Sequence, residues 1–397
     1  MKVLHLAGHL IKWNLDAYYQ NSIGEGFIIC AYNFEDGYFN RDKISGYSTS
    51  DILNNAYFDL QYFAKKDAKN INKGKLQTYS FHPAKAPDDG SHTNIWIENL
   101  IKLGIKFQIE SLGLKNVIIP NYYENDNLEQ FVGMIKTINK WLSNNKVEGV
   151  KYYMTIPITN HTIIDAEKVD KLLFYLTDLS IVFDGYYILC ESKPDARQKV
   201  STDFKYLNNL TTILHVLKKQ KFTTIYSYAN WDALIFLSLT DIDYITIGTY
   251  ENLRNFSIKR FTIDEDGGPS KGWYFSEKLL NFIKSPWLDL IRINNGLDLI
   301  KNERNIFSDA ILILGYPWSN QKPEVHKNYL LSIERLLKEV ASIEDLTARK
   351  QFMIDRIDDA IATYNKLNDM NIFFDDESRN YHLGTWKTFL LSKSILT

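Results

Sequence analysis

One unit recurs four times between residues 116 and 254, and this rhythm limits the possible folds more than any motif does. Each copy is a short apolar run rich in β-branched and aromatic residues, followed by a polar break and an amphipathic helix. The runs lie at 116–120, 152–158, 185–190 and 223–228, and a further run at 243–248 closes the series. Units of this length are typical of βαβ crossovers, which place successive strands parallel and adjacent.

The full count of elements favours a barrel. Helices are expected at 128–142, 165–179, 204–219 and 231–239, and further strands at 26–34, 78–82 and, as an eighth, 309–315. The pattern therefore predicts an α/β fold, a TIM-like (β/α)8 barrel that is incomplete or irregular in places. A doubly wound open sheet is the alternative, but no G-x-G-x-x-G or P-loop motif follows any strand.

The chain is expected to divide into a barrel and a helical region. We expect the barrel over 1–325, with a loop insertion near 255–275 that includes the glycine-rich stretch before Trp273. A helical region follows over 326–397, where Leu330, Ile333 and Leu337 recur at helical spacing. This region is predicted either to pack on the barrel or to dock on a protein partner.

Composition narrows the class of partner and the compartment. The formal net charge of −2 argues against a nucleic-acid partner held by a basic surface. Cys30 and Cys190 are the only cysteines and both lie in apolar runs, so no disulfide framework or cysteine zinc site is expected. We recognise no signal peptide, and no run of 18 apolar residues suggests a membrane span. These features favour a cytoplasmic protein that does not enter a membrane.

Candidate ligand-binding residues follow from the barrel itself, because the carboxyl ends of parallel strands meet around one mouth. Polar or charged side chains stand just after most of the predicted strands. Those predicted to bind a ligand are His82, Lys85, Asn121, Asn160, Lys193, Asn230, Asp232 and Arg254. Loops are polar in every water-exposed protein, so the same pattern also fits a barrel without a site.

Two carboxylates are the candidates for catalysis. Glu191 and Glu251 each follow an apolar strand closely, and two carboxyl groups facing one cavity can divide the acid and the base or nucleophile roles in glycosidic cleavage. The alternative is that they form loop ion pairs, Glu191 with Lys193 and Glu251 with Arg254.

No residue pattern identifies a cofactor or a metal. His5 and His9 have the i, i+4 spacing that would align two imidazoles on a helix, but the glutamate of the H-E-x-x-H motif is missing. His82 and His161 stand near predicted strand ends without an H-x-H pair on the first strand. The G-x-S-x-G spacing occurs at 268–272, but no predicted strand immediately precedes it, so a nucleophile elbow is not expected there.

Three functional hypotheses remain open. The first is a barrel enzyme of hydrolase or glycosyl-transfer type that binds a small polar, glycoside- or nucleoside-like ligand at the mouth. The second is a non-catalytic scaffold or interaction subunit of a bacterial multi-protein system such as phage defence, a hypothesis that rests on the Lys- and Asn-rich composition. The third, nucleic-acid processing, requires a basic groove around Lys193, Lys259 and Arg260.

Overall fold

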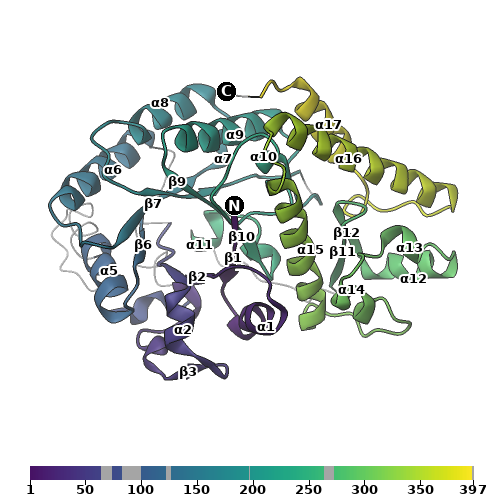
Figure 1. The fold of residues 1–397 in the computed structure, drawn as a ribbon, viewed down its shortest axis with the longest axis horizontal. Helices are drawn as coiled ribbons and strands as arrows, with labels where there is room; N and C mark the ends of the chain where they lie inside the picture. The colour runs from purple at the N-terminus through teal and green to yellow at the C-terminus, as the bar shows by residue number, and fades with distance from the viewer. Residues whose placement is uncertain (64–73, 83–99, 122–126, 196, 263–271, 396–397) are drawn as a thin grey trace.

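The computed structural model describes residues 1–63, 74–82, 100–121, 127–195, 197–262 and 272–395. Eight strands form one sheet in the order β5-β2-β1-β10-β9-β8-β7-β6, and every pairing within it is parallel. The strands are β1 (Lys2–Ala7), β2 (Phe27–Cys30), β5 (Ala56–Asp59), β6 (Asn116–Ile119), β7 (Lys151–Ile158), β8 (Gly185–Cys190), β9 (Thr223–Ser227) and β10 (Tyr244–Gly248). Because β10 pairs with β1, the sheet curls into a nearly closed (β/α)8 barrel, and this confirms the predicted fold class (Figure 1).

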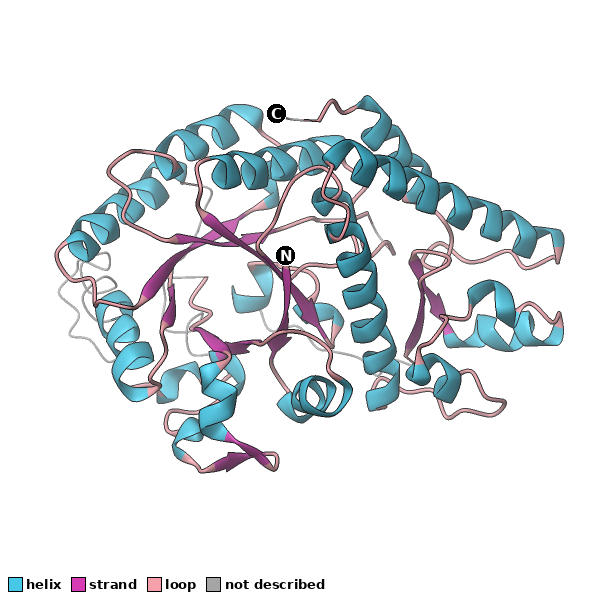
Figure 2. Ribbon diagram, viewed as in Figure 1, coloured by secondary structure: helices cyan, strands magenta, loops and turns pink. Residues whose placement is uncertain are grey.

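Helices cover the outside of the barrel (Figure 2). They are α1 (Ile11–Asn21), α2 (Thr49–Asn54), α5 (Leu103–Lys106), the π-helix η6 (Phe107–Ser111), α6 (Leu128–Ser143), α7 (Asn160–Ile163), α8 (Ala166–Leu176), α9 (Phe204–Lys219) and α10 (Ala233–Leu237). Three of the longer ones begin at side-chain caps, since Asn127, Asp165 and Asp203 accept backbone N–H groups of α6, α8 and α9. The predicted helices of the repeat are thus present.

Short elements lie in the loops of the first half of the chain. They are the 3-10 helices η1 (Ala31–Asn33), η2 (Tyr38–Asn40) and η3 (Leu76–Thr78), and a short hairpin of β3 (Lys43–Ile44) and β4 (Tyr47–Ser48).

After β10 the chain forms a group of smaller elements that are not part of the eight-stranded sheet. It contains η7 (Glu251–Leu253), α11 (Lys259–Thr262), the antiparallel hairpin of β11 (Trp273–Ser276) and β12 (Asn281–Lys284), α12 (Ser285–Ile293), α13 (Leu297–Ile300) and α14 (Ile306–Ile311). The chain then returns to the barrel through α15 (Pro323–Ala341), which contacts α1, α10 and β10. Helices α16 (Leu346–Asp369) and α17 (Leu383–Ser392) end the helical C-terminal region (Figure 1).

Two of the predicted strands are wrong. The segment 78–82 is not extended, because η3 and a turn occupy it, and the segment 309–315 is helical over α14 and a turn after it. Their places in the barrel are taken by β1 and β5, which the sequence pattern did not predict. The predicted strand 26–34 is shorter, because η1 begins at Ala31.

The spacing of His5 and His9 does not align two imidazoles on a helix, because His5 lies on β1. Its Nε2 lies 2.7 Å from the carbonyl oxygen of Ile23, and the amide of Asn14 lies 3.3 Å from Nδ1. Burial is the main cause that lowers the pKa of His5, to about 4. His5 is therefore a neutral, hydrogen-bonded core residue.

Side chains fill the barrel interior. Inward-facing residues of the strands pack with residues from the loops above them into one buried cluster. It contains Leu4, Leu6, Ile28, Cys30, Tyr57, Phe63, Ile118, Tyr153, Tyr187, Leu189, Ile225, Tyr228, Leu253, Phe256 and Phe261. The barrel is thus a packed core and not a pore.

One seam interrupts the sheet, because β5 and β6 lie at its two ends and contact each other without a ladder of hydrogen bonds. The side-chain amide of Gln108 in η6 hydrogen-bonds to the backbone of β6 at this edge. Its Nε2 donates to the carbonyl of Ile118 at 2.9 Å, and its Oε1 accepts the Ile118 N–H at 3.1 Å. A buried side-chain amide thereby satisfies the edge of β6 where a strand would otherwise pair.

Candidate functional site at the ends of β9 and β10

The structure brings several predicted residues together at the carboxyl ends of the last two barrel strands. Asn230 and Asp232 follow β9, and Glu251 and Arg254 follow β10. Beside them lies a cavity of about 100 Å3. Its lining residues are Tyr250, Glu251, Arg254, Gly272, Trp273, Phe282, Asn320, Val325, His326 and Tyr329. The walls come from the loop after β10, the β11–β12 hairpin and the first turns of α15.

Arg254 forms one wall of this cavity. Its guanidinium carbon lies 4.5 Å from the ring centroid of Tyr329 and 4.7 Å from that of Phe282. A cation at this distance is attracted by the negative face of the aromatic ring. Desolvation by burial lowers the pKa of Arg254, but a guanidinium remains protonated in proteins, so a positive charge faces the cavity.

Glu251 carries the negative charge of the site. Its carboxylate lies 2.9 Å from Nζ of Lys199, whose side chain is only 8% exposed and sits 4.2 Å above the ring centroid of Trp273. Desolvation acts to raise the pKa of Glu251, but the positive charges of Lys199, Arg254 and Arg260 together outweigh it, so that the pKa is lowered. The carboxylate is ionised at neutral pH and can act as a base or nucleophile, not as a proton donor.

Asn230 and Asp232 act through hydrogen bonds to neighbouring residues. The amide of Asn230 donates to the Lys199 carbonyl at 3.2 Å and accepts from the Tyr329 hydroxyl at 3.4 Å. Asp232 is buried and accepts a hydrogen bond from Tyr206 at 3.3 Å. Burial raises the pKa of Asp232 to about 6. These residues fix the backbone and rings around the cavity without lining it.

His326 closes the cavity from α15. Its Nδ1 lies 2.7 Å from the Thr249 carbonyl oxygen and its Nε2 lies 2.8 Å from that of Asn320, while its ring stacks on Trp13 at 5.0 Å between centroids. Burial lowers the pKa of His326, against the effect of the two carbonyl oxygens. The ring ties the loop after β10 to α15.

Glu191 has a different environment from Glu251. Its Oε1 accepts the Ile258 N–H at 2.7 Å and its Oε2 accepts the Asn160 N–H at 3.1 Å. The side-chain amide of Asn160 in turn donates to the Glu191 carbonyl at 3.4 Å. The carboxylate therefore joins the ends of β7 and β8 to the loop after β10, and it does not line the cavity.

The other predicted binding residues lie away from the cavity. Lys193 is exposed, with a left-handed φ of 40°. Asn121 is buried and donates to the Thr155 carbonyl at 3.4 Å, and His82 is buried with its ring 5.6 Å from that of Tyr62. Lys85 lies outside the described residues.

Sequence reasoning missed a polar chain inside the barrel. The Tyr187 hydroxyl donates to Asp59 Oδ2 at 2.9 Å, and the Ser227 hydroxyl donates to Tyr187 at 2.9 Å. Burial raises the pKa of Asp59 to about 7. The available signal was an aspartate at the end of a short apolar run, where a barrel would place a site residue. The aromatic rings of Phe63 and Phe256, with centroids 5.3 Å apart, cover this chain at the mouth.

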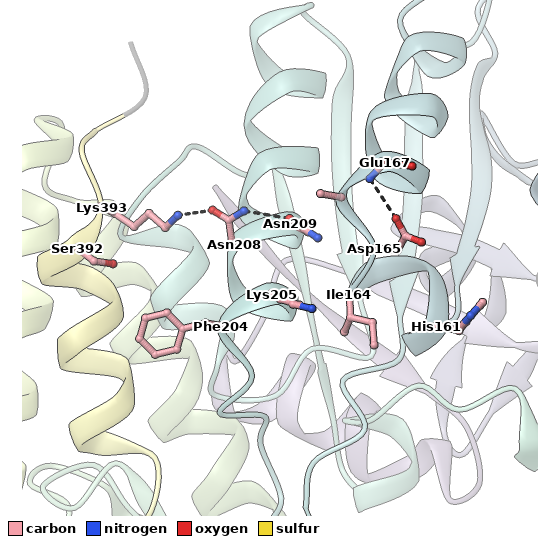
Figure 3. Close-up of a pocket in the computed structure, with 11 residues that line it drawn as sticks. His161, Ile164, Asp165, Glu167, Phe204, Lys205, Asn208, Asn209, Ser392 and Lys393 are labelled. Carbon is pink, nitrogen blue, oxygen red and sulfur yellow. Dashed lines mark hydrogen bonds between the residues drawn. The ribbon is translucent and has the colours of Figure 1, made fainter.

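A larger groove of about 880 Å3 lies outside the barrel, between the first turns of α8 and α9 and the end of α17 (Figure 3). Several of its polar side chains already have hydrogen-bond partners within the chain. Asp165 accepts the Glu167 N–H at 3.1 Å, and Lys393 donates to the side-chain oxygen of Asn208. The Lys168 ammonium lies 2.8 Å from Nδ1 of His161. The groove is therefore a weaker candidate than the smaller cavity.

The sequence matches no protein-family model, and no curated protein shows significant similarity to it. Within the described part of the chain, no group of three or more histidine, cysteine, aspartate or glutamate residues is arranged to hold a metal ion. No helix there is both long and apolar enough to span a bilayer. Burial raises the pKa of Cys30 and of Cys190, so neither thiol is activated.

Proposed function

We propose that the protein is a barrel enzyme of hydrolase or glycosyl-transfer type, which takes one end of a glycoside- or nucleoside-like ligand into the cavity beside Arg254. Glu251 supports this proposal most directly, because it is an ionised carboxylate at the wall of an aromatic-lined cavity. Trp273 and Tyr250 offer flat faces for a sugar or a base. At about 100 Å3 the cavity is smaller than ordinary ligand pockets, so the rest of the ligand extends outward past Glu251.

In this proposal the two predicted carboxylates have different roles. Glu251 acts as the base or nucleophile toward the ligand. Glu191 is a positioning residue, because both of its oxygens accept backbone N–H groups and hold the loop that carries Glu251. Asn230, Asp232 and Arg254 complete the site by holding the rings and the backbone around the cavity.

The first prediction tests this division of roles with a panel of p-nitrophenyl glycosides and nucleosides. We expect the wild-type protein to release nitrophenol or free base from at least one compound. Glu251→Gln should lower kcat by about 100-fold or more, because acid–base groups contribute at least that factor. Glu191→Gln should lower it less, since the neutral amide still accepts hydrogen bonds through one oxygen. Glu129→Gln, at an exposed position on α6, is the matched control.

Two outcomes would contradict the proposal. One is a full panel without turnover by the wild-type protein, and the other is a Glu251→Gln variant as active as the control.

The scaffold hypothesis is supported by a different surface. Ile293 at the end of α12 is 78% exposed and Leu314 is 81% exposed. Arg292 brings their segments together, because it donates to the carbonyls of Leu312 and Ile313 at 2.8 and 3.1 Å. Exposed apolar side chains of this kind can mark a protein interface. The predicted docking face of α15 is instead covered, since Leu330, like the other apolar residues of its stripe, is buried. A protein with only this role would turn over none of the panel.

A further inference from the structure

Arg254 differs from the two lysines near the cavity. Lys199 pairs with Glu251 at 2.9 Å, and Lys284, which lies near Trp273, pairs with Asp375 at 2.6 Å and also with Glu377. Among the residues that the structure describes, no carboxylate comes within 4.0 Å of the Arg254 guanidinium, which contacts the two aromatic rings and hydrogen-bonds with the Tyr329 side chain. Arg254 therefore lines the cavity without a direct ion pair, and Glu251 attracts it only over a longer distance.

The first turn of α15 lies at the same cavity. The helix is 19 residues long and begins at Pro323 without a side-chain cap, and its residues Val325 and His326 line the cavity. The amino end of a helix carries a partial positive charge and N–H groups that lack a partner in the helix. In this turn the Val325 N–H already donates to the Lys322 carbonyl at 3.2 Å and Glu324 adds a carboxylate, so Arg254 is the principal donor for an oxyanion.

The position of the cavity in the barrel also suits the binding of an anion. β9 and β10 are the seventh and eighth strands around the barrel, and the cavity is formed by the loop after β10 and the amino end of a helix. Barrels of this architecture often bind phosphate after these two strands, which is an analogy of fold and not of sequence.

We infer that the cavity beside Arg254 is an oxyanion site, which recognises a phosphate or carboxylate group on the ligand. This inference rests on the proposed function for the rest of the ligand. Arg254 lies against Tyr329 and Phe282 at the cavity wall, and a guanidinium offers a planar fork of N–H donors that can match two oxygens of an anion. The small volume suits one such group.

The second prediction is measured by isothermal titration of the full chain with inorganic phosphate and, separately, with acetate. Chloride keeps the ionic strength constant, because phosphate also stabilises proteins by exclusion from their surface. We expect saturable phosphate binding by the wild-type protein, and at least a tenfold loss of affinity in Arg254→Gln. Arg254→Lys should fall between them, because an ammonium keeps the charge but loses the fork. Tighter binding of acetate than of phosphate would assign the site to a carboxylate.

Arg379→Gln, at an exposed arginine paired with Asp376, is the control and should bind like the wild type. If Arg254→Gln does not fold, Arg254→Lys decides, and an unchanged affinity in that variant would overturn the inference. Lack of saturable binding by the wild type to both anions would also overturn it. Glu251→Gln should still bind phosphate, so loss of turnover with retained binding separates the proposed function from the oxyanion site.

Discussion

At the scale of single residues, the barrel interior contains an ionisable group that the proposed function does not use. Asp59 ends β5 within the packed core, with one oxygen on the Gln61 N–H at 2.9 Å and the other on the Tyr187 hydroxyl. These bonds favour the charged form, but the cost of desolvation is larger and raises the pKa of Asp59 to about 7. The folded protein therefore holds a proton that the unfolded chain releases near pH 4.

The third prediction concerns the pH dependence that follows. Between pH 4 and pH 7 the folded state binds more protons at Asp59 than the unfolded state, so its contribution to stability falls as the pH rises. From pH 5 to pH 8 the wild-type protein should lose about 3 kcal/mol relative to Asp59→Asn, whose amide does not titrate. Urea unfolding of both proteins at the two pH values measures the difference. Parallel pH profiles would show that Asp59 does not have a raised pKa.

At the scale of elements, the barrel strands with the longest apolar runs were predictable. β7 and β8 lie within a residue of the predicted segments, because a strand buried on both faces leaves a continuous apolar run. β1 and β5 were missed because polar residues, such as His5 and Asp59, interrupt short runs. The run at 309–315 was misleading for the opposite reason, since Ile313 and Leu314 are exposed after a helix.

Only those residues of the candidate site that closely follow a barrel strand were predictable, because side chains at the carboxyl ends of the strands meet around one mouth. This geometry pointed to Glu251 and Arg254, which line the cavity. Trp273, His326 and Tyr329 come from the hairpin and from α15, which are brought to the barrel mouth by packing alone. No local pattern in the sequence marks these residues, so sequence reasoning had no basis for grouping them with the strand ends.

The fourth prediction tests how closely two barrel strands approach. Gly185 begins β8 opposite Thr223 of β9, and a Cβ at Gly185 would lie 2.1 Å from the Thr223 carbonyl oxygen. Because that neighbour is backbone, Gly185→Ala should destabilise the protein by about 3 kcal/mol. Gly133→Ala is the matched control, since a Cβ there on α6 meets no atom within 4 Å, and it should stabilise by about 0.5–1 kcal/mol. Equal unfolding midpoints for the two variants in denaturant would contradict this account.

At the scale of the whole molecule, the chain closes its barrel in two different ways. On one side β10 pairs with β1 through a parallel ladder, and α15 covers the join. On the other side the seam between β5 and β6 has no ladder, and the buried amide of Gln108 takes the hydrogen bonds of Ile118. An open edge inside a core would otherwise leave backbone groups without partners, which costs about 1–3 kcal/mol for each group.

The fifth prediction follows from this seam. Gln108→Leu keeps the volume of the side chain but removes both partners of Ile118, so we expect a loss of about 2–5 kcal/mol in the free energy of unfolding. Hydrogen exchange should show the loss of these bonds locally. In the variant the Ile118 amide should exchange faster than the amides of β8, because β8 has a neighbouring strand on each side. Gln351→Leu, on the exposed face of α16 where the amide bonds Asp355, should change stability by less than about 0.5 kcal/mol. If Gln108→Leu is as stable as that control, with Ile118 still protected, then β5 and β6 pair in solution and the barrel is fully closed.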